Sequence, residues 1–185
     1  MPKRTGATGM IFERQEKKFM VAPRRFSLLM EGLASHMEQD HYGLHNICTI
    51  YFDTEDYAII RHSLDKPKFK EKLRLRSYGV PDAGETVYRE LKKKLNGVTY
   101  KRRMGMTLEQ ARNYLEFGLP PGNADSQIFG EIDWFVSKRR PVPKVLLSYD
   151  RIALFGKDAP EYRITFDHHI PWRNEQLDLG KGEQG

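Results

Sequence analysis

The chain has 185 residues, of which 39% are hydrophobic and 11% aromatic, so disorder is excluded and one domain spanning residues 1–185 is expected. Lys and Arg (31) exceed Asp and Glu (25), and this excess favours polyanionic partners without naming one. The single cysteine, Cys48, excludes an internal disulfide framework, and no apolar run approaches the about 20 residues of a membrane span, so a cytoplasmic location is expected.

The first predicted elements are a strand and a helix. Polar and apolar residues alternate over Ile11–Val21, which places Arg14, Glu16 and Lys18 on one face of a strand. Pro23 then stands at a favoured position in the first turn of a helix. The apolar face of this helix is expected to hold Phe26, Leu29, Met30, Leu33 and Met37.

Two further strands are predicted at Asn46–Asp53 and, more briefly, at Tyr57–His62, before a stretch with an unusual charge pattern. The sequence KFKEKLRLRSYG, residues 68–79, read as a strand, places five cations on one face: Lys68, Lys70, Lys72, Arg74 and Arg76. Two residues of strand advance about 6.6 Å, so these cations form one column along the strand. The rest of the fold has to explain this column.

A β-hairpin is predicted where Asn96–Gly97 separates the alternating runs Glu85–Leu95 and Val98–Arg103. With these two residues as the turn, the facing pairs are Leu95 with Val98, Lys94 with Thr99, Lys92 with Lys101, and Glu90 with Arg103. Two facing lysines destabilise a sheet by up to about 1 kcal/mol. Water and salt would screen one such pair on an exposed face.

Two helices and two strands follow the hairpin. Thr107 and Gln110 form a capping-box pattern, and Gly118 suits the end of the helix that they begin. Ser126 is expected to cap another helix, whose inward residues are Ile128, Ile132, Phe135 and Val136. The last predicted strands are Lys144–Leu154 and Tyr162–His168.

Basic residues share one phase on at least six of the predicted strands, which a single solvated face does not explain. The amphipathic helices must cover the apolar face of the sheet, so the basic faces point away from them. If the sheet closes, those faces line its interior, and an interior of Lys and Arg requires an anion. The sequence therefore predicts an α+β fold: an antiparallel β-barrel with amphipathic helices on its outside and a channel for a chain of phosphates.

Other polar residues are given structural interpretations. Lys93 and Arg102 are out of phase with the other cations and are expected outside the channel. Asp53 is expected to organise the turn after its strand, and Cys48 to be a small buried apolar residue.

Six segments, taken in order, carry a resemblance to a known family: Arg14-x-Glu16-x-Lys18, IYFDT (50–54), LRLRSYG (73–79), YRELKKKLNGVTYKRR (88–103), SYDRIAL (148–154) and YRITFD (162–167). Together they resemble the VTC domain, the polyphosphate polymerase domain of the vacuolar transporter chaperone complex, within the CYTH-like triphosphate tunnel metalloenzymes. The resemblance implies a tunnel of antiparallel strands that binds ATP phosphates and Mn²⁺ or Mg²⁺. It also implies transfer of the γ-phosphate of ATP onto a growing polyphosphate chain.

The resemblance also implies roles for residues of this chain. The phosphate-binding cations would be Lys18, Arg74, Arg76, Lys92, Lys101, Arg151 and Arg163. Among them Arg74, Arg76 and Lys92 would be catalytic, while Glu16 and Glu90 would hold the divalent metal. The expected ligands are ATP, triphosphate and polyphosphate, and nucleic acid is not expected.

The chain departs from the family pattern at its C-terminal end. Family members continue into a strand with a metal-binding glutamate, whereas this chain ends in LDLGKGEQG. The barrel is therefore expected to be incomplete, with an open side beside Tyr162–His168. Residues 1–185 alone are expected to bind tripolyphosphate and to turn over ATP poorly.

Two functions stay open beside the polymerase: a triphosphatase, which differs only in using water as the acceptor, and a non-catalytic binder of polyphosphate or nucleotide. Binding of single-stranded nucleic acid is disfavoured, because that mode needs aromatic platforms and the column of cations carries only Tyr78. Glu16, Glu90 and Asp167 would also repel a nucleic-acid backbone.

Overall fold

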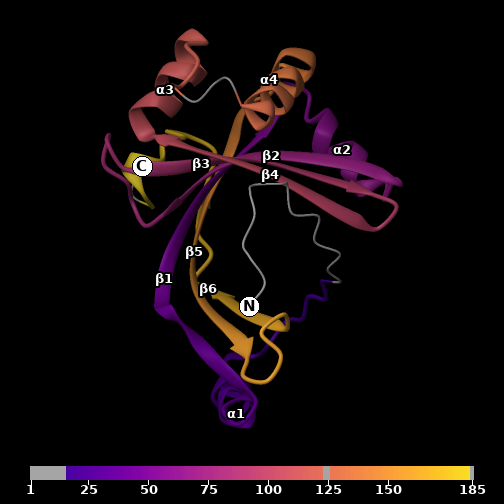
Figure 1. The fold of residues 1–185 in the computed structure, drawn as a ribbon, viewed down its shortest axis with the longest axis vertical. Helices are drawn as coiled ribbons and strands as arrows, with labels where there is room; N and C mark the ends of the chain where they lie inside the picture. Colours follow the sequence, from indigo (N-terminus) through magenta and orange to yellow (C-terminus); the bar gives the residue numbers. More distant parts are fainter. Residues whose placement is uncertain (1–15, 123–125, 184–185) are drawn as a thin grey trace, which may run out of the picture.

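The structure is a computed structural model that describes residues 16–122 and 126–183. Its centre is an antiparallel sheet of seven strands with the order β4-β3-β2-β1-β5-β6, in which β7 pairs with β5 (Figure 1). The strands are β1 Met37–Asp53, β2 Phe69–Tyr78, β3 Thr86–Leu95, β4 Val98–Thr107, β5 Val142–Gly156, β6 Arg163–His168 and β7 Trp172–Arg173. The helices are α1 Pro23–Leu33, α2 Ala58–Leu64, α3 Leu108–Phe117, α4 Gln127–Arg139 and the short 3-10 helix η1 Leu179–Lys181. The predicted α+β class is confirmed.

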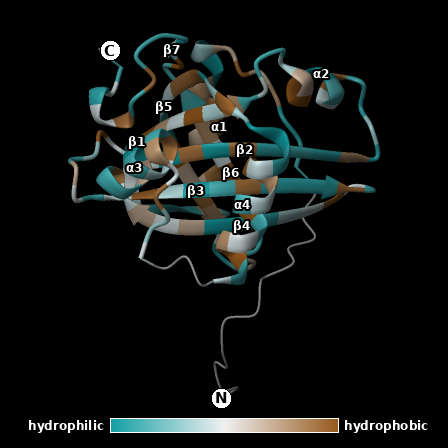
Figure 2. Cartoon of the chain, turned by 90° about the horizontal axis from the view of Figure 1, so that it is seen from above, coloured by the Kyte–Doolittle hydropathy of each residue, from teal (hydrophilic) through white to brown (hydrophobic). Residues whose placement is uncertain are grey.

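The hydrophobic core lies on one face of the sheet, under α3 and α4. Strand residues of one phase form it, including Cys48, Leu73 and Leu91, each 0% exposed. From α4, Ile132 and Phe135 pack against them. Both helices lie on the same side of β2, β3 and β4 in Figure 1. The opposite phase is left for polar residues, and β2 and β3 are coloured mostly hydrophilic in Figure 2.

The local signals around the hairpin and the two covering helices are confirmed. The β3–β4 register has Leu95 opposite Val98 and Lys92 opposite Lys101, as predicted from the Asn96–Gly97 turn. Both residues of this turn have positive φ, as a tight hairpin turn requires. The caps are also as predicted: Thr107 and Gln110 form the capping box of α3, Gly118 ends it in the left-handed conformation, and Ser126 caps α4.

The segment predicted as a short strand at Tyr57–His62 is instead helical, so that prediction was wrong. Its residues begin α2, and Asp53 explains why. The carboxylate of Asp53, at the end of β1, accepts hydrogen bonds from the backbone N–H groups of Ile59 and Ile60 at 2.8 and 2.9 Å. These bonds satisfy N–H groups that a helix start leaves unpaired. Asp53 thus organises the turn after its strand, as expected.

The N-terminal predictions hold only in part. Residues 11–15 of the predicted strand lie outside the described residues, and residues 16–21 have no strand structure. The helix opened by Pro23 is present as α1, but it ends at Leu33, and Met37 belongs to β1. None of its residues is buried, so α1 does not cover the main core. It contacts β6 through the ring of Phe26, which meets Phe166 edge-on at 5.1 Å, near the far end of β1 and β5 (Figure 1).

The sheet does not close within the described residues. Its path runs from β4 to β6, so these two strands are its edges. The expectation of an incomplete barrel that is open beside Tyr162–His168 is therefore confirmed.

After β6 the chain returns to the core, where Leu179 of η1 is 0% exposed. Asp178 accepts two hydrogen bonds from Arg112 of α3, both at 2.8 Å, and so fastens this returning segment. No helix within the described ranges has the length and hydropathy that crossing a membrane requires.

Candidate phosphate-binding site

The register of five neighbouring strands gathers the predicted cations on the face of the sheet opposite α3 and α4. Directly paired residues of antiparallel strands share a face. Arg74 pairs with Tyr51 and Glu90, and Glu90 pairs in turn with Arg103. We call this side the cationic face and define it by Lys72, Arg74, Arg76, Glu90, Lys92, Lys101, Arg103, Tyr149, Arg151 and Asp167.

Glu90 of β3 is the centre of the charge network on this face. It is 1% exposed, yet it accepts from Nε of Arg74 at 2.5 Å and from Nε of Arg103 at 2.6 Å. The ammonium of Lys101 lies 2.7 Å from it. Burial raises the pKa of this carboxyl, but Arg74, Lys101 and Arg103 outweigh burial and lower the pKa to about 2. Glu90 is therefore ionised at neutral pH, and one carboxylate balances three cations.

Arg76 of β2 is different, because it is buried with no carboxylate partner in residues 16–122 and 126–183. It is 6% exposed. Its Nε donates to the hydroxyl of Thr49 at 3.3 Å and its Nη2 to the hydroxyl of Tyr149 at 3.0 Å. Burial and the neighbouring Arg74 both lower the pKa of this guanidinium. A buried cation next to another cation is costly unless an anion joins it.

Arg151 of β5 extends the cationic face toward β6. Its Nε and Nη2 donate to the two carboxylate oxygens of Asp167 at 2.6 and 2.7 Å, and its guanidinium lies 5.1 Å from the ring centroid of Tyr149. Burial lowers the pKa of Arg151, but Asp167 and Tyr149 outweigh it and the net pKa is raised. This guanidinium is fixed in place by a paired acid and an aromatic ring.

The facing lysines Lys92 and Lys101 lie beside the segment before α1. The ammonium of Lys92 is 3.7 Å from a carboxylate oxygen of Glu16, and Lys18 is also 3.7 Å from Glu16. Glu16 and Glu90 thus border the lysine pair from two sides. The side chain of Lys18 is 85% exposed, so its place at the site depends on an irregular segment and not on a strand.

The predicted residues do not all come together. Arg74, Arg76, Lys92, Lys101 and Arg151 share the cationic face. Arg163 pairs with Phe155, four residues along β5 from Arg151, which places it about 13 Å away toward α1. The sequence reasoning missed Arg103 as a member of the cluster. The signal was present, because the hairpin register already placed Arg103 opposite Glu90.

The residues that would hold a metal can be judged by their donor chemistry. Glu16 and Glu90 offer carboxylate oxygens, which suit Mg²⁺ and Mn²⁺, and Mg²⁺ commonly takes one or two carboxylates together with phosphate oxygens. Both carboxylates are engaged by cations. Within the described residues no group of three or more His, Cys, Asp or Glu side chains is placed to hold a metal ion. The two carboxylates therefore suit a metal ion whose other ligands are phosphate oxygens of the bound substrate. That Glu16 and Glu90 hold a metal stays a prediction.

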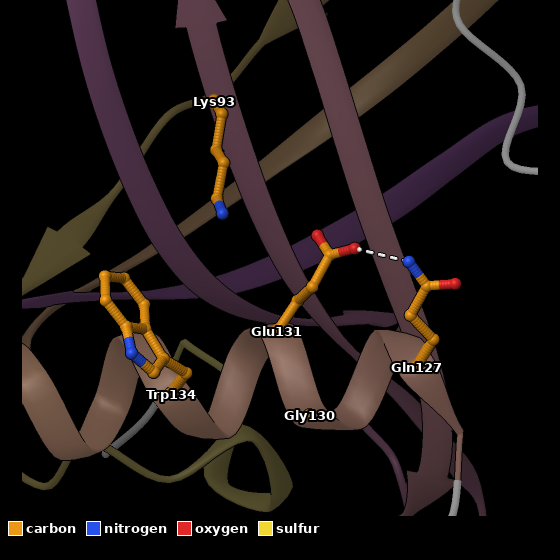
Figure 3. A pocket seen from close by; sticks show the side chains of 5 residues that line it. All are labelled: Lys93, Gln127, Gly130, Glu131 and Trp134. Carbon is orange, nitrogen blue, oxygen red and sulfur yellow. Dashed lines mark hydrogen bonds between the residues drawn. The ribbon is translucent and has the colours of Figure 1, made fainter.

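The opposite face of the hairpin carries a shallow hollow that belongs to α4. Lys93, Gln127, Gly130, Glu131 and Trp134 line about 430 Å³ (Figure 3). On the same face, Arg102 donates to Glu131 at 2.9 Å. Lys93 and Arg102 thus lie outside the cationic face, as their phase predicted.

Comparisons with known proteins give one family and a set of distant folds. The family model described as the VTC domain matches residues 13–184. None of the curated proteins matches the chain. A Bacillus halodurans structure, provisionally assigned as an adenylate cyclase, has 15% identity and a TM-score of 0.48 over 88% of this chain and 81% of that chain. A Hippeastrum protein, provisionally assigned as an adenylyl cyclase and described as having a dominant triphosphatase activity, has 15% identity and a TM-score of 0.38 over 74% of this chain and 68% of that chain. Neither likeness is close enough to assign an activity.

Proposed function

Because the chain belongs to the VTC domain family, we propose that it binds ATP and polyphosphate on its cationic face and transfers the γ-phosphoryl group of ATP to a polyphosphate chain. The transfer would depend on Mn²⁺ or Mg²⁺. Arg74, Arg76 and Lys92 are the proposed catalytic residues.

The observation that carries this proposal is the environment of Arg76. Its guanidinium is buried, is not paired with a carboxylate in the described ranges, and lies beside Arg74, which lowers its pKa. A phosphate oxygen would supply the missing negative charge, and a guanidinium fork suits phosphate geometry. An arginine with only a structural role at the surface would keep its guanidinium in water, whereas that of Arg76 is buried.

The other cations extend the site along the direction of a phosphate chain. Lys92 and Lys101 provide point charges at one side of Arg74 and Arg76, and Arg151 provides a fixed fork at the other. Phosphoryl transfer needs positioning and charge neutralisation more than it needs a protein nucleophile. Lys18 and Arg163 would serve the same chain further out.

Glu90 explains how the cations of the site can lie close together when no ligand is bound. In the described structure it neutralises Arg74, Lys101 and Arg103. Incoming phosphate oxygens would take over these cations, and the released carboxylate of Glu90, with Glu16, would then hold the divalent ion. When bound, that ion supplies further neutralisation of phosphate charge.

The test is to incubate residues 1–185 with ATP and Mn²⁺ or Mg²⁺ and to separate long polyphosphate from free phosphate. Long polyphosphate, lost in Arg76→Met and kept in Lys93→Ala, supports the polymerase. Free phosphate alone indicates a triphosphatase. Binding of tripolyphosphate without turnover indicates a binding domain, and absence of any binding overturns the proposal.

The non-catalytic binder is the second candidate, and one observation favours it. Both carboxylates near the lysine pair are ion-paired to cations, and no cluster of three potential metal ligands is found in the described parts of the chain. Such a site would hold a phosphate chain by its cations alone.

A further inference from the structure

We propose that the cationic face continues into an aromatic subsite, formed by Tyr78, His45 and Tyr42, that stacks the nucleobase of a nucleoside triphosphate. The inference rests on the proposed function, because it assigns a place for the base of the ligand whose phosphates the cations would hold. The rings of this subsite lie on β1 and β2.

The rings form a continuous series that starts among the cations. Tyr88 lies opposite Arg76 in the register, and its ring centroid is 5.9 Å from that of Tyr78. Tyr78 is 6.2 Å from His45, and His45 is 5.8 Å from Tyr42. The series then ends at His41, 3.8 Å from Tyr42. The sequence pattern indicates only Tyr78 beside the column of cations, because the other rings are brought in by strand pairing and by a bulge.

The backbone of β1 holds the outer rings in place. The β1–β5 pairing shifts register between Gln39 and Leu44, and Gly43 in this bulge has a φ of 61°, a conformation that favours glycine. The carbonyl of Gly43 lies 3.2 Å from Nδ1 of His45 and orients its ring. The irregularity thus turns Tyr42 toward the same series of rings.

The position of Tyr78 fits a base attached to a triphosphate. Tyr78 is two residues beyond Arg76 on β2, about 6.6 Å along the strand, which is the scale of the ribose that separates a base from its phosphates. Arg103 donates to its hydroxyl at 2.9 Å, so the ring adjoins the phosphate-binding cluster directly. The series therefore gives the site a direction, with phosphates toward the lysine pair and the base toward Tyr42.

The solvent exposure of these rings indicates that they form a surface for stacking and are not part of the hydrophobic core. Tyr78 is 50% exposed and Tyr42 is 67% exposed, although both lie in an ordered series of rings. Exposed aromatic side chains beside a cationic groove are the features that stack bases in single-stranded nucleic-acid sites, and such stacking tolerates any base. The subsite would accept purine nucleoside triphosphates with little discrimination.

The alternative role of these rings is to support guanidinium groups. Arg103 lies 4.3 Å from the ring centroid of Tyr88 and 5.9 Å from that of Tyr78. Support of this kind would affect every phosphate ligand equally. A base subsite would affect ATP and GTP but not tripolyphosphate, so the ratio of the two dissociation constants separates the roles.

The experiment is calorimetric titration of residues 1–185 with ATP, GTP and tripolyphosphate at one fixed ionic strength. Tyr42→Ala and Tyr78→Leu are expected to raise the Kd for ATP and GTP roughly tenfold more than the Kd for tripolyphosphate. Tyr78→Phe keeps the ring and loses the hydroxyl, so its ratio is expected to stay at the wild-type value. Tyr162→Ala, which removes another exposed tyrosine just before β6, is the matched control.

The outcomes are distinct. If all three ligands weaken equally in Tyr78→Leu and Tyr42→Ala, the rings only support the cations and the subsite is overturned, while the proposed function stands. If the wild-type chain binds no tripolyphosphate, both the proposed function and the subsite fail. Tyr42→Ala carries the test if Tyr78→Leu does not fold, because Tyr42 lies on the surface.

Discussion

Two buried arginines on neighbouring strands, Arg76 of β2 and Arg89 of β3, lie on opposite faces of the same sheet. Arg76 is 6% exposed and Arg89 is 2% exposed. Arg89 points under α3, where its guanidinium lies 4.5 Å from the ring centroid of Tyr114 and 5.7 Å from that of Phe52. Arg76 has a second guanidinium, Arg74, as its charged neighbour.

The comparison shows that burial alone does not mark a functional cation. Burial lowers the pKa of Arg89 to about 10, and Tyr114 and Asp133 oppose this effect. The guanidinium of Arg89 is surrounded by aromatic rings that belong to the core, so we assign this arginine a structural role. Arg76 lies beside a second guanidinium, and the opposing effects of Tyr149 and Glu90 still leave its pKa lowered, so we expect a ligand anion to offset its charge. Each substitution proposed below on the cationic face is paired with a matched substitution on the helix-covered face.

The largest effect is expected from Glu90→Gln. This change leaves Arg74, Lys101 and Arg103 without their common carboxylate, and loss of one partner from a buried charge network costs about 3–5 kcal/mol. Chemical denaturation without anion should show this loss in the free energy of unfolding. Tripolyphosphate should restore much of it, because its oxygens replace the carboxylate.

The matched control for Glu90 is Glu71→Gln on the helix-covered face. Glu71 is 9% exposed, and its partners Lys93 and Arg139 lie at 3.9 and 4.0 Å. Its loss should cost about 1 kcal/mol, because pairs at such distances are weak. Tripolyphosphate should not restore that loss. Equal rescue of both variants would show that the anion stabilises the fold without using the cationic face.

Acid should remove the contribution of Glu90 over a defined pH range. Its folded pKa, about 2, is depressed below the ordinary value of 4.5, so the stabilisation is complete above the unfolded pKa and is lost as the pH falls from 4.5 toward 2. The full contribution is about 3 kcal/mol. The difference in unfolding free energy between wild type and Glu90→Gln should therefore be flat above pH 5 and shrink below it. A difference that shrinks near pH 6 would mean that Glu90 is not held ionised.

Substitution of the two arginines tests the comparison directly. Arg76→Met should weaken tripolyphosphate binding by roughly 30-fold, about 2 kcal/mol, because a charged hydrogen-bond donor is lost. The unliganded fold should keep its stability, because a methionine relieves the proximity to Arg74. Arg89→Met should leave tripolyphosphate binding unchanged, by isothermal titration. Equal losses of affinity in both variants would show that burial, and not the face of the sheet, decides the effect.

The sequence predicts those parts of the fold that depend on local signals or on strand phase. The Asn96–Gly97 turn gives the register of β3 with β4, and that register assigns Lys92 and Lys101 to one face. The caps at Thr107 and Ser126 define helix starts for the same reason, since each cap needs only residues a few positions away. The family resemblance, confirmed by the match to residues 13–184, supplied the expectation of a tunnel of antiparallel strands.

Features that depend on distant partners were not predictable from the pattern. The strand predicted for Ile11–Val21 fails in its described part, because alternation is local whereas a strand needs a hydrogen-bonded neighbour. Phe19 is 79% exposed there. The α2 helix depends on Asp53, and the aromatic series depends on the bulge before His45. Arg163 has the predicted phase, but the phase does not determine how far from Arg151 it lies along the strand direction.

The smallest effect on stability is expected from Lys92→Ala, and it separates ligand binding from folding. The change removes repulsion from Lys101 and a 3.7 Å ion pair with Glu16, whose carboxylate is largely exposed. Each contributes up to about 1 kcal/mol with opposite sign, so the melting temperature without ligand should stay the same or rise slightly. The stabilisation by tripolyphosphate should shrink, because a phosphate contact is lost. Lys93→Ala, one residue away on the opposite face, should keep the full shift. Thermal melts with and without tripolyphosphate check both variants, and a full shift in Lys92→Ala would remove Lys92 from the site.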